Sequence, residues 1–397
     1  MATPKRSGRR TAGVHVAVLS WVVCSLGCEP GILTREGDIA LVDAGPRTDA
    51  PGADAPGVDA PGVDAPGVDA PGVDAPGTVD GGVDGGPDDP CLGVACDSGA
   101  MCVAGECVCR EGFVDDGSGC VAPPAGDPAT RSMGDVCDGW NAGHVTNASP
   151  EWMDDGLTCG PGVMARAGID DTLRRINMYR WLAGMTPIVD DPARHDGMME
   201  CAAMMSVNGM LSHSPPMSWT CYTAAGATAA SRSNIALGYG SSPLAINGYM
   251  RDRNVDSLGH RRWILSSRLA SVGIGFSSTG SRPGQCLGVI GGTGAPTERP
   301  WSSYPNQGFA PMETALDVWS FQPYAMSLTG SSAGSIVRTS DGADMPVVSE
   351  RQPSGGSVDA VKMTPMGWTP VAGETYRVTI TDLSTGELSY EVTPVDC

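Results

Sequence analysis

The chain has 397 residues, with 25 Lys and Arg against 45 Asp and Glu, and its formal net charge is -20. Affinity for nucleic acid comes mainly from Lys and Arg that displace counterions from phosphates, so this charge excludes nucleic acid as an expected partner. The charge is uneven, because residues 1–28 carry +4 while residues 29–90 and residues 91–397 carry -12 each. A hydrophobic fraction of 41% permits a buried core, and the length permits several domains.

Residues 1–28 predict an export signal. Four basic residues among the first ten precede an apolar run from Val14 to Val23. As a helix this run would span about 15 Å, half of a bilayer core of about 30 Å, so we expect a signal peptide rather than a membrane span. The run is followed by Leu26-Gly27-Cys28, which resembles the lipobox of bacterial lipoproteins, although Ser25 stands where that family usually has Leu. The resemblance implies a lipid anchor on Cys28 and a place in the cell envelope, as an outer-membrane lipoprotein; plain secretion is the alternative.

Residues 29–90 predict a disordered stalk. From Ala50 the chain repeats Ala-Pro-Gly-X-Asp, and the only apolar side chains in each repeat are Ala, Pro and Val. Such a segment cannot bury a core, and an Asp in every repeat keeps it extended by charge repulsion. We therefore expect it to separate the anchor from the folded part of the chain.

Residues 91–120 predict a small disulfide-rich module. The cysteines are Cys91, Cys96, Cys102, Cys107, Cys109 and Cys120. Their spacing leaves the connectivity open, and zinc is disfavoured because the usual two-residue gaps between ligands are missing. The single residue between Cys107 and Cys109, with Gly112-Phe113 after it, resembles an epidermal-growth-factor-like (EGF-like) module. That resemblance implies the pairs Cys91 with Cys102, Cys96 with Cys107, and Cys109 with Cys120, in a spacer or contact surface.

Residues 137–300 predict an α+β domain in which helices come first and strands later. Apolar residues at helical spacing from Leu173 to Leu182 predict one helix, and Asp191-Pro192 and Ser242-Pro243 predict the starts of two more. The period then changes to two, since Val272, Ile274 and Phe276 alternate with small residues, which is typical of a strand.

Five segments of this domain follow one another in the order typical of one family. They are Asn177-Met178-Tyr179-Arg180, Gly184 to Ile188, Leu211-Ser212-His213-Ser214, Ser233-Asn234-Ile235-Ala236-Leu237-Gly238, and Gly259-His260-Arg261-Arg262-Trp263-Ile264-Leu265. The segments resemble the CAP superfamily of cysteine-rich secretory, antigen 5 and pathogenesis-related proteins, over about residues 169–290. The resemblance implies an α-β-α sandwich with a cleft that holds two histidines and two acidic residues, and in some members a divalent metal. His213 and His260 stand where those histidines would be.

The acidic half of the implied cleft departs from the family. Ser233-Asn234-Ile235 stands where members commonly have Glu-Asn-Ile, and Asp252 lies nearest to the place of the second acid. His213, His260 and Asp252 could hold Zn²⁺ or another divalent metal weakly, but Asp252 would then have to be both a ligand and the general base. We therefore expect a cleft, including Ser233 and Asn234, that binds an extracellular lipid, glycan or protein without catalysis. A zinc-dependent hydrolase of peptide or ester bonds is the alternative.

The remaining cysteines and the C-terminal region complete the expected architecture. Proximity along the chain suggests that Cys137 pairs with Cys159, Cys201 with Cys221, and Cys286 with Cys397. Residues 301–397 predict a small β-sandwich, because alternating apolar residues on either side of Ser384-Thr385-Gly386 are typical of a hairpin.

Overall fold

The computed structural model describes residues 40–42, 90–91, 94–96, 99–110, 112–297, 299–355 and 357–397. The predicted signal peptide, with Cys28, lies outside the described residues, as does most of the predicted stalk. In the part of the chain that is described, no helix combines the length and the apolar character needed to span a bilayer.

The cysteine-rich segment consists of two small hairpins. The strands are β2 (Ala100–Val103) with β3 (Glu106–Cys109), and β4 (Val114–Asp115) with β5 (Cys120–Val121). Disulfides join Cys91 to Cys102, Cys96 to Cys107, and Cys109 to Cys120. These are the three pairs that the EGF-like resemblance implies.

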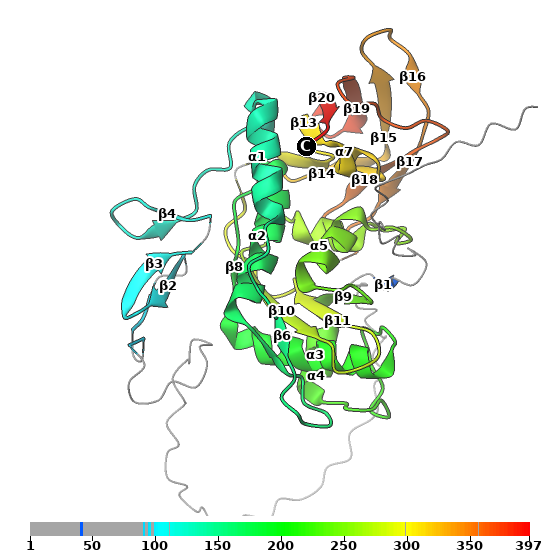
Figure 1. The fold of residues 1–397 in the computed structure, drawn as a ribbon. Coiled ribbons are helices and arrows are strands. Elements are labelled where there is room, and N and C mark those ends of the chain that lie inside the picture. Colours follow the sequence, from blue (N-terminus) through cyan, green and yellow to red (C-terminus); the bar gives the residue numbers. More distant parts are fainter. Residues whose placement is uncertain are drawn as a thin grey trace, which may run out of the picture. The chain divides into compact units, whose positions relative to one another are not determined.

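The next part of the chain is built on a five-stranded sheet in the order β1-β9-β11-β10-β8 (Figure 1). Its strands are β1 (Ala40–Val42), β8 (Val189–Asp190), β9 (Ser233–Leu237), β10 (Ser271–Ser277) and β11 (Gly284–Gly288). All neighbours are antiparallel except β8 and β10. The edge strand β1 comes from inside residues 29–90, so three residues of the predicted stalk pair with the sheet.

Helices and strands of this sheet are interleaved along the chain, because β8 precedes α3 and β9 precedes α5, so the predicted order of helices first and strands later is wrong. They are α1 (Met133–His144), α2 (Arg166–Leu182), α3 (His195–Asn208), α4 (Ala224–Ala230), α5 (Ser242–Arg251) and α6 (Gly259–Ile264). Short elements join them: η2 (Pro128–Thr130), η3 (Pro192–Arg194), and the strand pair β6 (Trp152–Met153) and β7 (Val163–Met164). The predicted helix starts are confirmed to within a few residues: Pro192 opens η3 directly before α3, and the cap of α5 is Ser241 rather than Ser242.

The helices cover both faces of the sheet and form two cores. Ile235 and Leu237 of β9 pack with residues of α3 and α4, whereas Ala236 packs in the core formed with α2 and α5. Figure 1 shows α3 and α4 on one side of β10 and β11, and α2 and α5 on the other. Gly275 allows α3 to approach β10 closely, because a Cβ there would lie 2.1 Å from the backbone of Met198. This is an α-β-α arrangement, and the α+β fold class is confirmed.

Residues 301–397 form two sheets with a shared core. One sheet has the order β12-β14-β18-β17 and the other β13-β20-β19-β15-β16. The elements are β12 (Trp301–Tyr304), β13 (Gly308–Pro311), α7 (Met312–Ala315), β14 (Trp319–Pro323), β15 (Leu328–Arg338), β16 (Asp344–Met345), β17 (Val347–Gln352), β18 (Ala360–Pro365), β19 (Tyr376–Leu383) and β20 (Gly386–Val395). Trp319 and Phe321 from the first sheet and Val378 and Tyr390 from the second lie in one buried cluster. The predicted hairpin is β19 and β20.

The disulfides of the larger domain differ from the predicted pairs. The structure joins Cys137 to Cys397, Cys159 to Cys221, and Cys201 to Cys286. The prediction from proximity was wrong because the packing of layers, rather than sequence distance, brings these residues together. Cys201 on α3 lies against Cys286 on β11, and the last residue of the chain returns to α1.

Glu151 provides a pH-dependent contact at the start of α5. Its carboxylate accepts hydrogen bonds from the Ser242 N–H at 2.9 and 3.2 Å. Burial raises the pKa of Glu151 from an ordinary 4.5 to about 7, the Ser242 N–H opposes this rise, and the charge of Asp171 adds to it. The folded state therefore binds a proton on the Glu151 carboxylate more tightly than the unfolded state does. For this reason the stability of the folded state falls as the pH rises from about 4.5 to about 7.

We expect Glu151→Gln to weaken this pH dependence, because a neutral amide replaces the titrating group. Between about pH 5 and about pH 8, the wild type should lose of the order of 2 kcal/mol more unfolding free energy than the variant. Thermal melts of both proteins across this range measure the difference. If the stability of the wild type and of Glu151→Gln changes with pH in the same way, Glu151 is not the titrating group.

Candidate functional site

A buried histidine and carboxylate pair lies where α5 ends and α6 begins. Asp252 follows α5 with φ 52°, in the left-handed region, and Leu258 precedes α6 with φ 53°. This turn brings the His260 Nδ1 to 2.6 Å from the Asp252 Oδ1, with both side chains fully buried. The other carboxylate oxygen, Oδ2, accepts a hydrogen bond from the Arg261 N–H at 3.2 Å. Both oxygens of Asp252 are therefore engaged, and the pair fixes the orientation of the imidazole.

Two neighbours that sequence reasoning did not single out hold this pair in place. Tyr249 stacks on the His260 ring, with centroids 5.1 Å apart and planes at 25°. The Arg261 guanidinium donates to the carbonyls of Met250 and Val318 at 2.6 and 2.7 Å. The available signal was the pair Arg261-Arg262, two charged residues that are both buried in the short helix α6.

His213 lies in the loop between α3 and α4. Its Nδ1 lies 2.8 Å from the Ala230 carbonyl oxygen at the end of α4. A carbonyl can only accept, so Nδ1 carries a proton, and in the neutral imidazole Nε2 is then an acceptor. The Nε2 atom is buried and has no hydrogen-bond partner among the described residues.

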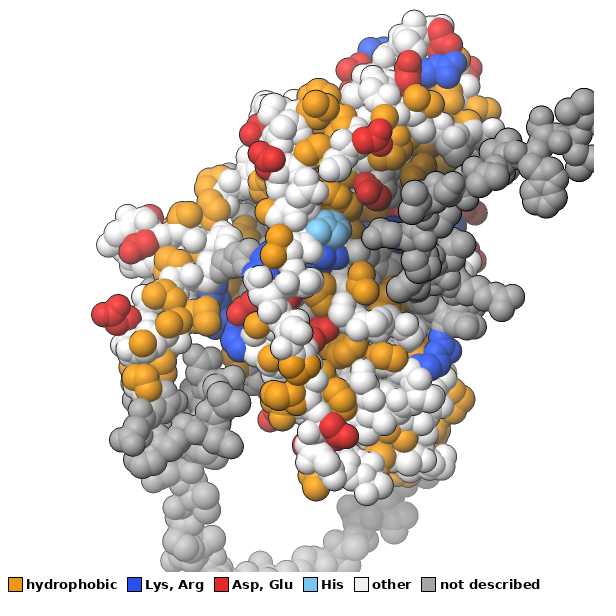
Figure 2. Space-filling view, viewed as in Figure 1, with side chains coloured by type: hydrophobic (Ala, Val, Ile, Leu, Met, Phe, Trp, Pro, Cys, Tyr) orange, Lys and Arg blue, Asp and Glu red, His pale blue; other side chains and the backbone are white. Residues whose placement is uncertain are grey.

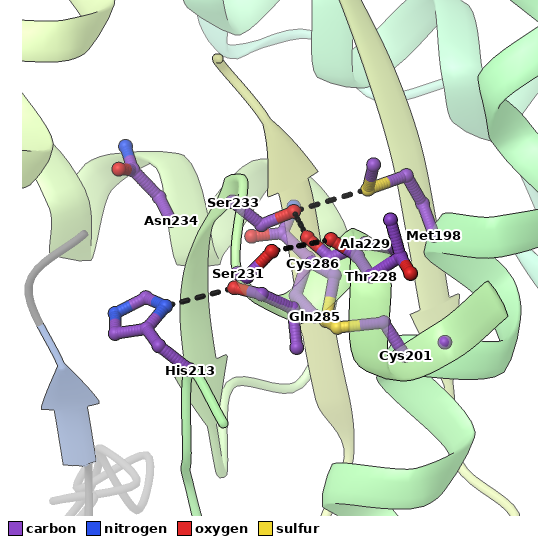
Figure 3. Close-up of a disulfide and its surroundings, with 12 residues drawn as sticks. Met198, Cys201, His213, Thr228, Ala229, Ser231, Ser233, Asn234, Gln285 and Cys286 are labelled. Carbon is purple, nitrogen blue, oxygen red and sulfur yellow. Dashed lines mark hydrogen bonds between the residues drawn. A yellow bond between two sulfur atoms is a disulfide. The ribbon is translucent and has the colours of Figure 1, made fainter. Parts of the chain in front are cut away.

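Asn234 and Ser233 point to opposite faces of β9, as Figure 3 shows. The Asn234 Nδ2 donates to the His260 carbonyl at 3.1 Å, and its Oδ1 is buried without a partner in the described part of the chain. Ser233 instead donates to the Ala229 carbonyl at 2.7 Å, beside the Met198 sulfur. The structure therefore places Asn234 beside His260, but turns Ser233 toward α3 and α4. We call His213, Asn234, Asp252 and His260 the histidine site.

The predicted metal ligands do not fit a metal in this arrangement. No group of three or more His, Cys, Asp or Glu side chains within the described ranges is positioned to hold an ion. Asp252 is committed to His260 and to the Arg261 N–H, and Ser233 offers no oxygen to this side of β9. We therefore derive no chemical step through a metal at His213, His260 and Asp252.

The acidic surface does not single out a partner. Figure 2 shows acidic side chains scattered over this face among hydrophobic and uncharged ones, rather than gathered in one patch. Cavities of about 480 and 490 Å³ are lined by other residues than His213 and His260. The histidine site is thus a set of buried polar atoms and not a part of these cavities.

Helices on both faces of the sheet and a buried histidine on α6 are what the CAP resemblance implies. Residues 173–290 match the model of the family described as "CAP: Cysteine-rich secretory protein family", so the chain contains a CAP domain at these residues. A search of curated proteins and a search of solved structures found no match to the chain. CAP proteins are typically extracellular, and six disulfides are typical of an exported protein.

Proposed function

We propose that this chain is an exported, surface-anchored binding protein whose CAP domain takes up an extracellular ligand without catalysing a reaction. The observation that carries this proposal is the Asp252 carboxylate, fully buried and engaged at both oxygens. A hydrolase needs a base within reach of the attacking water, and Asp252, the one residue expected to be both ligand and base, instead contacts the His260 Nδ1 and the Arg261 N–H.

The chemistry of the ligand follows from two acceptor atoms. The Nε2 of His213 and the Oδ1 of Asn234 are buried and have no protein partner among the described residues. A buried acceptor without a hydrogen bond costs about 1 to 3 kcal/mol, so a ligand that supplies N–H or O–H donors would bind favourably there. Hydroxyl-rich glycans and the amides of proteins carry such donors, whereas lipid acyl chains do not.

The anchor is the second part of the proposal. Leu26-Gly27-Cys28 follows an apolar run, and removal of Cys24 with the signal and lipidation of Cys28 leave the 12 cysteines that form the six disulfides. Mass spectrometry of the mature protein should find an acylated Cys28 as its first residue. A mature chain that starts at another, unmodified residue would refute the anchor.

The binding role is tested by calorimetry with named probes. We expect a member of a panel of oligosaccharides and short peptides to bind the wild type, and His213→Phe to weaken it about tenfold or more because the Nε2 acceptor is lost. Ser233→Ala is the matched control, since this hydroxyl lies on the opposite face of β9. Equal binding by His213→Phe, or binding only to phospholipid vesicles, would contradict the proposal.

A zinc-dependent hydrolase of peptide or ester bonds is the second candidate. It is favoured by the presence of both histidines, His213 and His260, in one domain. This candidate requires bound zinc and turnover that is lost in His213→Ala. Its metal would need ligands that the described arrangement does not bring together.

A further inference from the structure

A third, smaller pocket lies between the CAP domain and the C-terminal sheets. Its volume is about 200 Å³, and α1, α2, α5, β12 and α7 all contribute to its lining. Pockets for drug-sized ligands usually exceed about 300 Å³, so a ligand here would be smaller. The pocket shares no residue with the histidine site, and the inference does not rest on the proposed function.

Aromatic rings form the walls of this pocket. Trp140, Tyr179 and Tyr304 line it, and their side chains are largely buried. The centroids of Trp140 and Tyr179 lie 5.8 Å apart in an edge-to-face arrangement, and those of Tyr179 and Tyr304 lie 6.5 Å apart. Packing thus holds the rings in fixed positions. Ring faces attract cations, and the Tyr304 ring already carries the Arg261 guanidinium 4.0 Å from its centroid.

Two opposite charges line the same pocket without pairing. The Arg251 guanidinium and the Glu313 carboxylate both line it. Neither side chain has a hydrogen bond or ion pair with any residue that the structure describes. Both groups are therefore available to a ligand, although the charge of Arg251 also acts on Asp317, where it opposes the burial that raises the pKa of that carboxyl.

His144 adds a neutral acceptor. Its Nδ1 donates to the Trp140 carbonyl at 2.7 Å, which leaves Nε2 as an acceptor. Burial lowers the pKa of His144, and the charges of Arg175 and Arg251 lower it further, so the ring is neutral at neutral pH. The pocket consequently offers acceptors at His144 and Glu313 and a donor at Arg251.

We propose that this pocket binds a small zwitterion of single-amino-acid size. Its carboxylate pairs with the Arg251 guanidinium, and its ammonium group lies between the Glu313 carboxylate, the His144 Nε2 and the aromatic walls. A zwitterion satisfies both unpaired charges at once, whereas a simple anion or cation leaves one of them unpaired. Trp140, His144, Tyr304 and Glu313 lie outside residues 173–290, so the matched CAP domain alone does not form this site.

Calorimetry on the full chain tests the site with free glycine, L-alanine, L-valine and L-leucine as probes. We expect at least one of them to bind, and expect propionate and propylamine, which each carry one of the two charges, to bind at least about tenfold more weakly. Arg251→Gln and Glu313→Gln should each weaken binding by a similar factor, because each removes one charge-assisted contact.

The exposed residues Arg268 and Glu387 provide matched controls, so Arg268→Gln and Glu387→Gln should bind like the wild type. Circular dichroism verifies that every variant is folded. The proposal is overturned if none of the four amino acids binds, if propionate alone binds as tightly as the amino acids, or if folded Arg251→Gln retains the wild-type affinity.

Discussion

Arg180→Met should reduce the unfolding free energy of the chain by about 4 kcal/mol or more. Arg180 lies in α2 with its side chain fully buried, and its guanidinium donates to four backbone carbonyls, those of Thr186, Ile264, Ser266 and Leu269, at 2.7 to 3.2 Å. Burial lowers the pKa of Arg180 to about 10, so the group remains charged at neutral pH. Met fills a similar volume but removes the donor from all four carbonyls, although that of Ser266 keeps another hydrogen bond, from the Leu269 N–H at 3.3 Å.

Chemical denaturation of both proteins at neutral pH measures this loss. Arg180→Lys should recover only part of it, because one ammonium group cannot reproduce the planar fork of the guanidinium. Arg268→Met, at an exposed position, should change stability by less than about 0.5 kcal/mol. A loss below about 1 kcal/mol for Arg180→Met would show that the four carbonyls do not depend on this side chain.

Removal of the Cys201 to Cys286 disulfide is expected to cost about 4 kcal/mol. The bond joins α3 to β11 across a sequence separation of 85, and both cysteines are fully buried. A crosslink over such a long loop restricts the unfolded chain strongly. The double variant Cys201→Ala with Cys286→Ala should therefore unfold at a much lower denaturant concentration under non-reducing conditions.

The control removes a disulfide from the cysteine-rich segment instead. Cys96→Ala with Cys107→Ala opens a loop with a separation of only 11 and should leave the unfolding midpoint of the CAP domain unchanged. Peptide mapping of the wild type checks the pairing itself. A fragment that links Cys201 to Cys221 would contradict the structure and restore the pairing that proximity predicts.

Local patterns predicted the elements well, whereas contacts between layers could not be predicted. The strand at Val272 to Phe276 and the hairpin of β19 and β20 follow from alternation along the chain, and both are present. The disulfides of the larger domain depend on which helix packs on which strand, and no local pattern contains that information. The helix α1, whose residue Cys137 holds the C-terminus, was not predicted either, although its capping box of Ser132 and Asp135 is a local signal.

The histidine site was predicted in part. His260, Asp252 and Asn234 lie together as the family resemblance implies, but Ser233 does not join them. The signal for Ser233 was present, because residues two apart on a strand share a face. Ser233 therefore had to lie with the apolar Ile235 and Leu237, on the side of α3 and α4.

The central claim is that this CAP domain binds a ligand and does not catalyse hydrolysis through a metal. The most direct measurement is the zinc content of the purified wild type together with its turnover of peptide and ester substrates, with and without added zinc. The account predicts substoichiometric zinc and no turnover above that of His213→Ala with His260→Ala. Stoichiometric zinc, with turnover that the double variant loses, would contradict it.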